Sequence, residues 1–133
     1  MILQIDPSSG LAIYDQIVRQ LKFAVASGKL RPGELVPSVR ELSKQLAINP
    51  NTVARAYRQL QDERVLESVR GLGMQMANGA AKRCRADRKK LIATRLKEVF
   101  REARQSGLLR NEISGLIDKE LKTFPETAEA KAS

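Results

Sequence analysis

The 133-residue sequence predicts a mainly α-helical protein with one small β-hairpin. Three observations lead to this fold class. Apolar residues recur at helical spacing in several segments along the chain. Two short stretches of alternating residues, 66–69 and 74–77, flank a turn that contains two glycines. No apolar run approaches the ~18 residues that a membrane-spanning helix needs.

The N-terminal segment predicts a short arm followed by a helix. Residues 2–5 are apolar or uncharged and end at Asp6-Pro7, which indicates a strand or an arm. A helix is expected from about Ala12 to Ser27, with Gly28 as the natural residue after its end. The inner face of the helix is predicted to comprise Ile13, Ile17, Leu21, Ala24 and Val25. After the turn that follows the helix, Leu35 is expected to reach into the core.

The stretch 37–60 predicts two short helices joined by a tight turn. Ser38 and Glu41 have the Ser-x-x-Glu spacing of a capping box at the start of the first helix. Asn49 is a strong N-cap for the second helix, and proline is favoured at the first helical position, where Pro50 lies. The inner face of the first helix is predicted to comprise Val39, Leu42 and Leu46.

The second of these helices, which is expected to finish within Asp62–Val65, has two different faces. Its inner face is predicted to comprise Val53, Ala56, Tyr57 and Leu60. Its outer face is predicted to comprise Asn51, Arg55 and Arg58, flanked by Thr52 and Gln59. Amides, a hydroxyl and arginines on one face can read base edges and hold phosphates. The alternative is an ordinary amphipathic helix with a solvated charged face. The choice between these two interpretations depends on the neighbouring segments.

The segment after this helix predicts a β-hairpin with an arginine near its tip, because Arg70-Gly71-Leu72-Gly73 joins the two alternating stretches. A plain structural hairpin is the alternative. A hairpin directly after two helices joined by a tight turn is nevertheless the arrangement of a winged helix-turn-helix domain. In such a domain the tip of the hairpin can reach the minor groove of DNA. The chain carries 24 Lys+Arg against 15 Asp+Glu, a net charge of +9. Such a surplus favours a polyanionic partner, nucleic acid first and an anionic membrane surface second.

Composition argues against catalysis. Cys84 is the only cysteine and the chain has no histidine, so neither a zinc finger nor a Ser-His or Cys-His pair can be built. No glycine-rich phosphate loop occurs, and we expect no metal and no cofactor. Cys84 lies in a basic run that would favour its thiolate, so a redox role is the alternative to an incidental cysteine. The first ten residues do not resemble a signal peptide, and a cytoplasmic location is expected.

The C-terminal part predicts a helical hairpin. Residues 78–81 indicate a linker of small residues, followed by helices at about 85–105 and 111–122. The predicted domains are therefore 1–78, 79–124 and a disordered tail, 125–133. Two short amphipathic helices need another surface to cover them, and we favour a homodimer over a hairpin folded back on its own domain. The predicted dimerisation residues are Ile92, Leu96, Val99, Phe100, Ile113, Leu116, Ile117 and Leu121.

The chain resembles the GntR family of bacterial winged-helix transcription regulators. The resemblance rests on IYDQIVRQLKFAVASGKL, RPGELVPSVREL, INPNTVARAYRQL and the wing SVRGLGMQM, in that order. The short C-terminal part resembles the YtrA-type branch, in which a two-helix hairpin serves for dimerisation. The resemblance implies contacts with double-stranded DNA, and Tyr57 matches an aromatic residue whose hydroxyl can reach a phosphate. The DNA-binding residues implied are Ser38, Arg40, Asn49, Pro50, Asn51, Thr52, Arg55, Tyr57, Arg58, Arg70 and Gly71.

The function implied is sequence-specific transcription regulation by a dimeric repressor on an inverted-repeat operator, with no effector named. The alternative is a winged-helix module that binds RNA or protein. The chain departs from the family pattern at two places. Many members have Glu-Gly where this chain has Glu63-Arg64, and the loss of that glycine removes an easy left-handed cap. The wing continues as Met74-Gln75-Met76 rather than Thr-Phe-Val.

Overall fold

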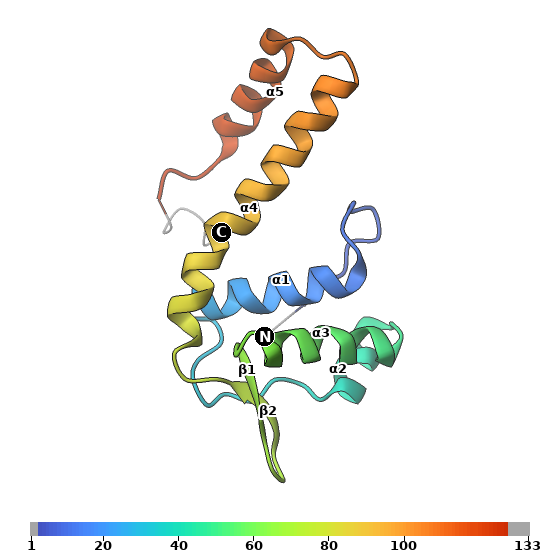
Figure 1. Cartoon of the computed structure of the whole chain (residues 1–133), viewed down its shortest axis with the longest axis vertical. Coiled ribbons are helices and arrows are strands. Elements are labelled where there is room, and N and C mark those ends of the chain that lie inside the picture. The colour runs from blue at the N-terminus through green and yellow to red at the C-terminus, as the bar shows by residue number, and fades with distance from the viewer. Residues whose placement is uncertain (1–2, 128–133) are drawn as a thin grey trace. The chain divides into compact units, whose positions relative to one another are not determined.

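The computed structural model describes residues 3–127, which form five helices and a two-stranded antiparallel sheet (Figure 1). By contacts the chain divides into two compact units, Met1–Leu91 and Ile92–Ser133. This architecture confirms the predicted fold class, mainly α with a small β-hairpin. None of the helices within residues 3–127 is long and apolar enough to cross a membrane. In chain order the elements are α1 (Ile13–Ala26), α2 (Val39–Leu46), α3 (Pro50–Asp62), β1 (Leu66–Val69), β2 (Gly73–Met76), α4 (Ala80–Gln105) and α5 (Arg110–Thr123).

The core of the first unit lies where α1 and α2 pack against α3, next to the base of the hairpin (Figure 1). Leu21 of α1 and Val53 of α3 are fully buried there. The prediction that Ile13 faces inward is wrong. Ile13 begins α1 and is exposed, and at this end of the helix Tyr14 packs against the core instead. The other buried residues of the predicted inner faces are Ile17, Ala24, Val25, Leu42, Ala56, Tyr57 and Leu60.

A local contact marks the end of α1, and the arm before the helix is held by the core and by Gln20. Gly28 follows the helix with φ +82°, and its N–H donates to the Val25 carbonyl, which confirms the predicted stop. Before α1, the described residues 3–5 form an arm rather than a strand. Leu3 is buried against the core, and the backbone N–H of Gln4 donates to the Gln20 side chain at 3.0 Å.

The segment before α2 differs from the prediction. Leu35 is 51% exposed, whereas Val36 is 6% exposed and belongs to the core. The Val36 N–H donates to the Met74 carbonyl at 2.9 Å, and Leu35 forms a bridge with Gln75. This segment therefore runs along β2 like a short third strand, and the alternation of a strand directs Leu35 outward and Val36 inward.

The end of α3 falls within the predicted range. α3 stops at Asp62, with Glu63 as its C-cap. Arg64 then takes the left-handed conformation, at φ +59°, where many family members have glycine. The Arg83 side chain donates a hydrogen bond to the Arg64 carbonyl. The chain therefore turns from α3 into β1 without a glycine, and Arg64 adopts an unfavourable backbone conformation to do so.

The start of α4 also differs from the prediction. α4 begins at Ala80, so Ala80 and Ala81 are helical and do not belong to a linker. The reason is packing, because Ala80 and Cys84 are both buried in the first unit. Burial raises the pKa of the Cys84 thiol, and this outweighs the lowering by nearby Lys22. The neighbouring cations thus act on the thiol as predicted, but burial has the larger effect and disfavours the thiolate.

A buried lysine connects three helical elements of the first unit. Lys22 of α1 is 5% exposed and forms ion pairs with Glu63, the C-cap of α3, and with Asp87 of α4, the latter at 3.8 Å. A lysine is rarely buried unless it is paired, and here two carboxylates compensate its charge. The end of α3 and the first turns of α4 are thus held against the same residue of α1.

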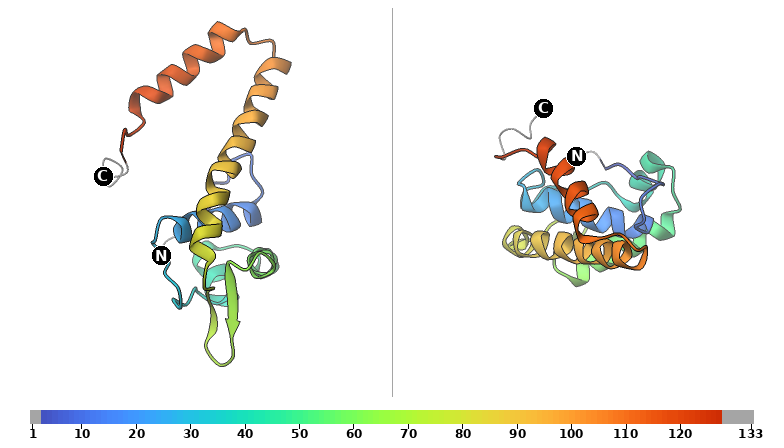
Figure 2. Two further views of the ribbon diagram at one scale, coloured as in Figure 1. Left: turned by 60° about the vertical axis from the view of Figure 1, so that its left-hand side comes forward. Right: turned by 90° about the horizontal axis from the view of Figure 1, so that it is seen from above.

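The second unit consists of the rest of α4 and of α5, which diverge from the turn between them (Figure 2). Gly107 ends α4 with φ +89°, and the Leu109 N–H donates to Glu112 at the start of α5. None of the α5 residues is buried. Residues 128–133, most of the predicted disordered tail, lie outside the described residues. The exposed large apolar residues on the helices of this unit are Ile92, Leu96, Val99, Phe100, Leu116 and Leu121, and those outside its helices are Leu108, Leu109 and Phe124.

Candidate nucleic-acid interface

The two helices α2 and α3 are held in place by caps at their starts. The Ser38 Oγ accepts a hydrogen bond from the Glu41 N–H at 3.0 Å, and the Glu41 carboxylate accepts one from the Ser38 N–H at 3.1 Å. The hydrogen bond from the Ser38 N–H, followed by that from the Ser38 side chain, lowers the pKa of Glu41. Asn49 caps α3 through its side chain, which accepts from the Asn51 N–H at 2.8 Å. The predicted capping box and N-cap are confirmed.

The turn between the two helices needs one left-handed residue. Ala47 takes this conformation at φ +54°, and its N–H and that of Ile48 return to carbonyls in the last turn of α2. Such hydrogen bonds satisfy carbonyls that a helix end leaves without partners. The start of α3 is therefore placed next to α2 by a short connection that these two hydrogen bonds hold.

Tyr57 connects α3 to the residue just before the capping box. Its side chain is 3% exposed, and its hydroxyl donates to the Pro37 carbonyl at 2.5 Å. Burial raises the pKa of Tyr57 above its ordinary value, so the hydroxyl keeps its proton. A phosphate offers only acceptors, and this proton is already donated within the protein. In this geometry the Tyr57 hydroxyl holds the segment before α2, and the phosphate contact that the resemblance implies would require this hydrogen bond to break.

The outer face of α3 is polar and open to solvent. Asn51, Arg55 and Arg58 are exposed, and Thr52 beside them is half-buried. Arg40, in the first turn of α2, is also exposed. The guanidinium carbon of Arg55 lies 3.8 Å from the centroid of the Tyr14 ring on α1, a contact that sequence reasoning did not predict. No local sequence pattern indicates this contact, because Tyr14 lies 41 positions before Arg55 in the chain.

The β-hairpin formed by β1 and β2 projects from the rest of the first unit (Figure 1). β1 and β2 pair in antiparallel register from Leu66 opposite Met76 to Val69 opposite Gly73. Gly71 occupies the tip at φ +81°, a conformation that favours glycine. Arg70 and Leu72 on either side are exposed, and Leu72 is an apolar residue at the tip to which sequence reasoning gave no role.

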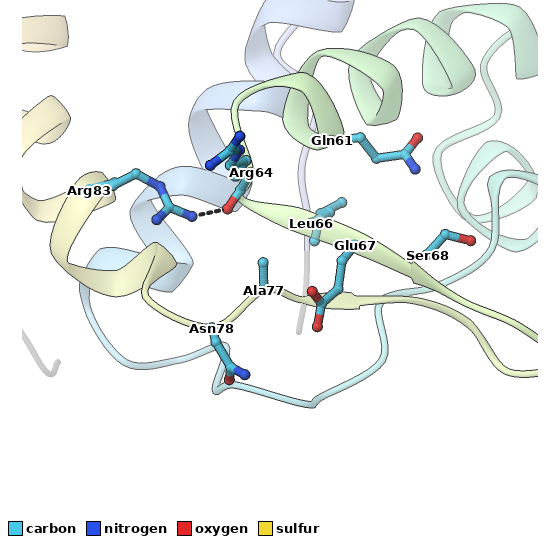
Figure 3. A pocket seen from close by; sticks show the side chains of 8 residues that line it. All are labelled: Gln61, Arg64, Leu66, Glu67, Ser68, Ala77, Asn78 and Arg83. Carbon is cyan, nitrogen blue, oxygen red and sulfur yellow. Dashed lines mark hydrogen bonds between the residues drawn. The ribbon is translucent and has the colours of Figure 1, made fainter.

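An open hollow of about 440 Å³ lies where α3, the hairpin and α4 meet (Figure 3). Arg64, Glu67 and Arg83 contribute charged groups to it, and all three are exposed to solvent. Part of the guanidinium of Arg83 is already used by the Arg64 carbonyl. Within residues 3–127, no group of three or more Cys, Asp or Glu side chains could hold a metal ion.

Comparison with known proteins identifies the family of this chain. Residues 13–75 match the family described as "Bacterial regulatory proteins, gntR family". The HTH-type transcriptional repressor YtrA of Bacillus subtilis (strain 168) is 36% identical over 107 residues, which span 80% of this chain and 82% of that protein. The chain belongs to the GntR family. The extent of this match also supports the YtrA-type branch.

Solved structures agree with this assignment. A structure described as a transcriptional antiterminator from Listeria monocytogenes EGD-e is 34% identical, with a TM-score of 0.63, and the match covers 90% of each chain. A second structure is that of the DNA-binding domain (DBD) of AraR in complex with operator ORX1. It is 28% identical to this chain, with a TM-score of 0.50, and the match covers 58% of this chain and 95% of the AraR chain. The chain is thus a DNA-binding transcription regulator with a winged-helix fold. Relatives of the chain are named as transcription regulators, among them YtrA of Bacillus subtilis and Rv1152 of Mycobacterium tuberculosis.

Proposed function

We propose that this GntR-family protein acts as a homodimeric repressor that binds an inverted-repeat operator through α3 and the wing. The observation that carries the proposal is the exposed, capped start of α3. Asn51 and Arg58 lie on its open face, and Tyr57 on its other face is fixed to the segment before α2. A rigid helix with a polar outer face can enter the major groove without first becoming ordered.

The proposed contacts fall into two classes. Arg40 and Asn51 would read base edges, since arginine pairs with guanine and asparagine with adenine in the major groove. Thr52 and Arg58 would bind phosphates, and Arg70 with Gly71 would place the wing tip in the minor groove. Phosphate contacts determine affinity and its dependence on salt, whereas base contacts determine the choice of sequence. Ser38, Asn49 and Pro50 would hold the first turns of both helices at the DNA surface.

The basic run at the start of α4 would add phosphate contacts. Residues 82–90 carry six basic side chains and one acidic one, and the six basic side chains are exposed. They include Arg83, which also binds the Arg64 carbonyl. A local excess of this size attracts DNA regardless of its sequence.

Dimerisation is proposed through the second unit. Its apolar stripes, on α4 from Ile92 to Phe100 and on α5 from Ile113 to Leu121, are exposed or half-buried in the single chain. Burial of these stripes against a second copy of the chain would stabilise the dimer, by roughly 25 cal/mol for each Å² of apolar surface removed from water. We accordingly propose residues 1–78 as the reading domain and 79–124 as the dimerisation hairpin. Two reading domains related by a two-fold axis fit an inverted repeat.

Repression follows from occupancy of promoter DNA, and the relative YtrA is named a repressor. Such a regulator would work in the cytoplasm, where the promoters of a bacterial cell lie. No residue of the chain points to a particular effector.

The deciding experiment is selection of bound duplexes from random double-stranded DNA by the full chain. The expected result is an enriched inverted repeat, with half-sites about one helical turn of ~10 base pairs apart. A single half-site would contradict the dimer. No enrichment, or tighter binding to RNA than to any duplex, would contradict sequence-specific regulation.

A pair of variants tests the assignment of base contacts. Arg40→Ala should remove most of the preference for the selected operator over random DNA, by about 10-fold or more, because one bidentate contact supplies ~1–3 kcal/mol. Lys29→Ala is the matched control, since it removes the same charge from the exposed turn after α1. Titrations of both duplexes should show little change for Lys29→Ala. An equal loss on operator and random DNA for Arg40→Ala would contradict base reading.

A further inference from the structure

Arg55 is the one exposed arginine of α3 whose head group rests on an aromatic ring of another helix. Its guanidinium carbon lies 3.8 Å from the centroid of the Tyr14 ring, well within the ~6 Å at which cations and aromatic faces attract each other. The two residues come from different elements, since Tyr14 lies in the first turn of α1 and Arg55 in the second turn of α3.

The ring is a rigid support for the arginine. Tyr14 is half-buried and packs against the hydrophobic core, and α1 and α3 pack directly on each other. Arg55 itself is exposed, so without the ring its long side chain would sample many rotamers. Contact with the ring face restricts the guanidinium to one flank of α3.

This contact leaves the chemistry of the guanidinium available. Its five N–H groups point outward in the plane of the group, and the arginines that donate side-chain hydrogen bonds within residues 3–127 are Arg19 and Arg83, not Arg55. The ion pairs within residues 3–127 do not include Arg55. The planar fork can therefore bind an oxyanion while it remains on the ring.

The position of the guanidinium favours a phosphate over a base. Base edges lie deep in the groove, in front of side chains that point straight out from a recognition helix. Phosphates line the two sides of the groove, where side chains that lean towards the flank of the helix can reach them. Arg55 leans towards α1, whereas Asn51 and Arg58 share the open face.

We infer that Tyr14 is a positioning residue that holds the Arg55 guanidinium at the α1 flank of α3, where it binds a DNA phosphate rather than a base edge. This inference rests on the proposed function, operator binding through α3 and the wing, and refines it at one residue. It assigns Tyr14, which sequence reasoning left without a role, to the interface.

Three variants test it: Tyr14→Phe, which keeps the ring, Tyr14→Leu, which replaces it by an aliphatic side chain, and Arg55→Gln, which removes the charge. The affinity of each full-length variant is measured for the selected operator and for a random duplex at several salt concentrations. We expect Tyr14→Phe to bind within twofold of wild type. Arg55→Gln should weaken both duplexes about 10-fold and reduce the salt slope by about 1, the value for one phosphate contact.

The double variant measures whether the two residues act together. Tyr14→Leu should weaken both duplexes about 3- to 10-fold, and adding it to Arg55→Gln should cause little further loss. Multiplicative losses would overturn the positioning role, as would a loss for Tyr14→Phe equal to that for Tyr14→Leu. A loss on the operator alone for Arg55→Gln would overturn the phosphate assignment. Urea denaturation of each variant separates a folding defect from a binding defect.

A measurement without DNA tests the contact itself. In the free protein, the ring of Tyr14 should shift the NMR signals of the Arg55 Cδ protons upfield, and the shift should persist in Tyr14→Phe and vanish in Tyr14→Leu. Its absence from wild type would overturn the inference. A wild-type chain that shows this shift but binds neither duplex would instead refute the proposed function, and with it the phosphate contact.

Discussion

Arg64 offers a sharp test of how this chain replaces a glycine of its family. It lies directly after the C-cap of α3, at φ +59°, a region that residues with a Cβ atom adopt at a cost. The hydrogen bond that it accepts from Arg83 uses its backbone carbonyl, which every substitution at position 64 retains. Arg64→Gly therefore removes the strain of the Cβ atom and leaves the local hydrogen bond in place.

The expected magnitude is the difference between two opposing effects. Relief of the left-handed conformation contributes about 1–2 kcal/mol to the free energy of unfolding. The greater freedom of glycine in the unfolded chain opposes this by about 0.5–1 kcal/mol. A net gain of about 0.5–1 kcal/mol follows. For a unit of this size, ~1 kcal/mol corresponds to an increase of about 4–8 °C in Tm.

Urea and thermal denaturation, followed by circular dichroism, measure this gain. Arg64→Ala is the matched control, because it removes the guanidinium but keeps the Cβ atom, and it should not raise the stability. The quantity of interest is the difference between the glycine and alanine variants. If Arg64→Gly is no more stable than Arg64→Ala, the left-handed residue carries no strain and the reasoning is refuted.

Three further variants probe contacts described above, each by urea denaturation. Lys22→Met should cost about 1–3 kcal/mol, below the ~3–5 kcal/mol of a fully buried pair, because the side chains of Glu63 and Asp87 are 34% and 41% exposed. Burial raises the pKa of Glu63, and hydrogen bonds, chiefly from Lys22, lower it to below its ordinary 4.5. The ion pair therefore stabilises the fold above pH ~4.5 and is lost as the pH falls through the lower folded pKa, so wild type should lose more stability than Lys22→Met on acidification. Ser38→Ala should cost about 1 kcal/mol through loss of the cap, and equal stability would show that the cap contributes nothing. Tyr57→Phe leaves the carbonyl before α2 without its donor and should cost about 1–3 kcal/mol, whereas a loss of DNA affinity at unchanged stability would restore the phosphate contact.

The features that the sequence predicted correctly are those that neighbouring residues determine. The capping box of Ser38 and Glu41 spans four positions, and the N-cap at Asn49 acts on an amide two residues away. Gly28 ends α1 through its own backbone freedom. The composition of such short segments suffices to define the two reading helices and the turns that bound them.

The features that the sequence missed depend on residues far away in the chain. Leu35 and Val36 are equally apolar, and only the pairing with β2, about 40 positions later, decides which of them faces the core. Ala80 looked like part of a linker, yet alanine is also the best helix former, and contact with the first unit extends α4 back to it. The stacking of Arg55 on Tyr14 likewise needs α1 and α3 to be packed first.

The short segment that precedes α2 joins the wing through its backbone. The Gly33 N–H donates to the Met76 carbonyl, the Met76 N–H to the Glu34 carbonyl and the Val36 N–H to the Met74 carbonyl. β2 therefore has hydrogen-bonded neighbours on both edges near its base, and it is not an open edge that could recruit a strand from another chain. The amides of Val36 and Met76 should exchange with deuterium only when the whole first unit unfolds, whereas those at the wing tip should exchange early. The entry to the reading helices and the base of the wing would then open as one cooperative unit, and early exchange at Val36 would show that they open separately.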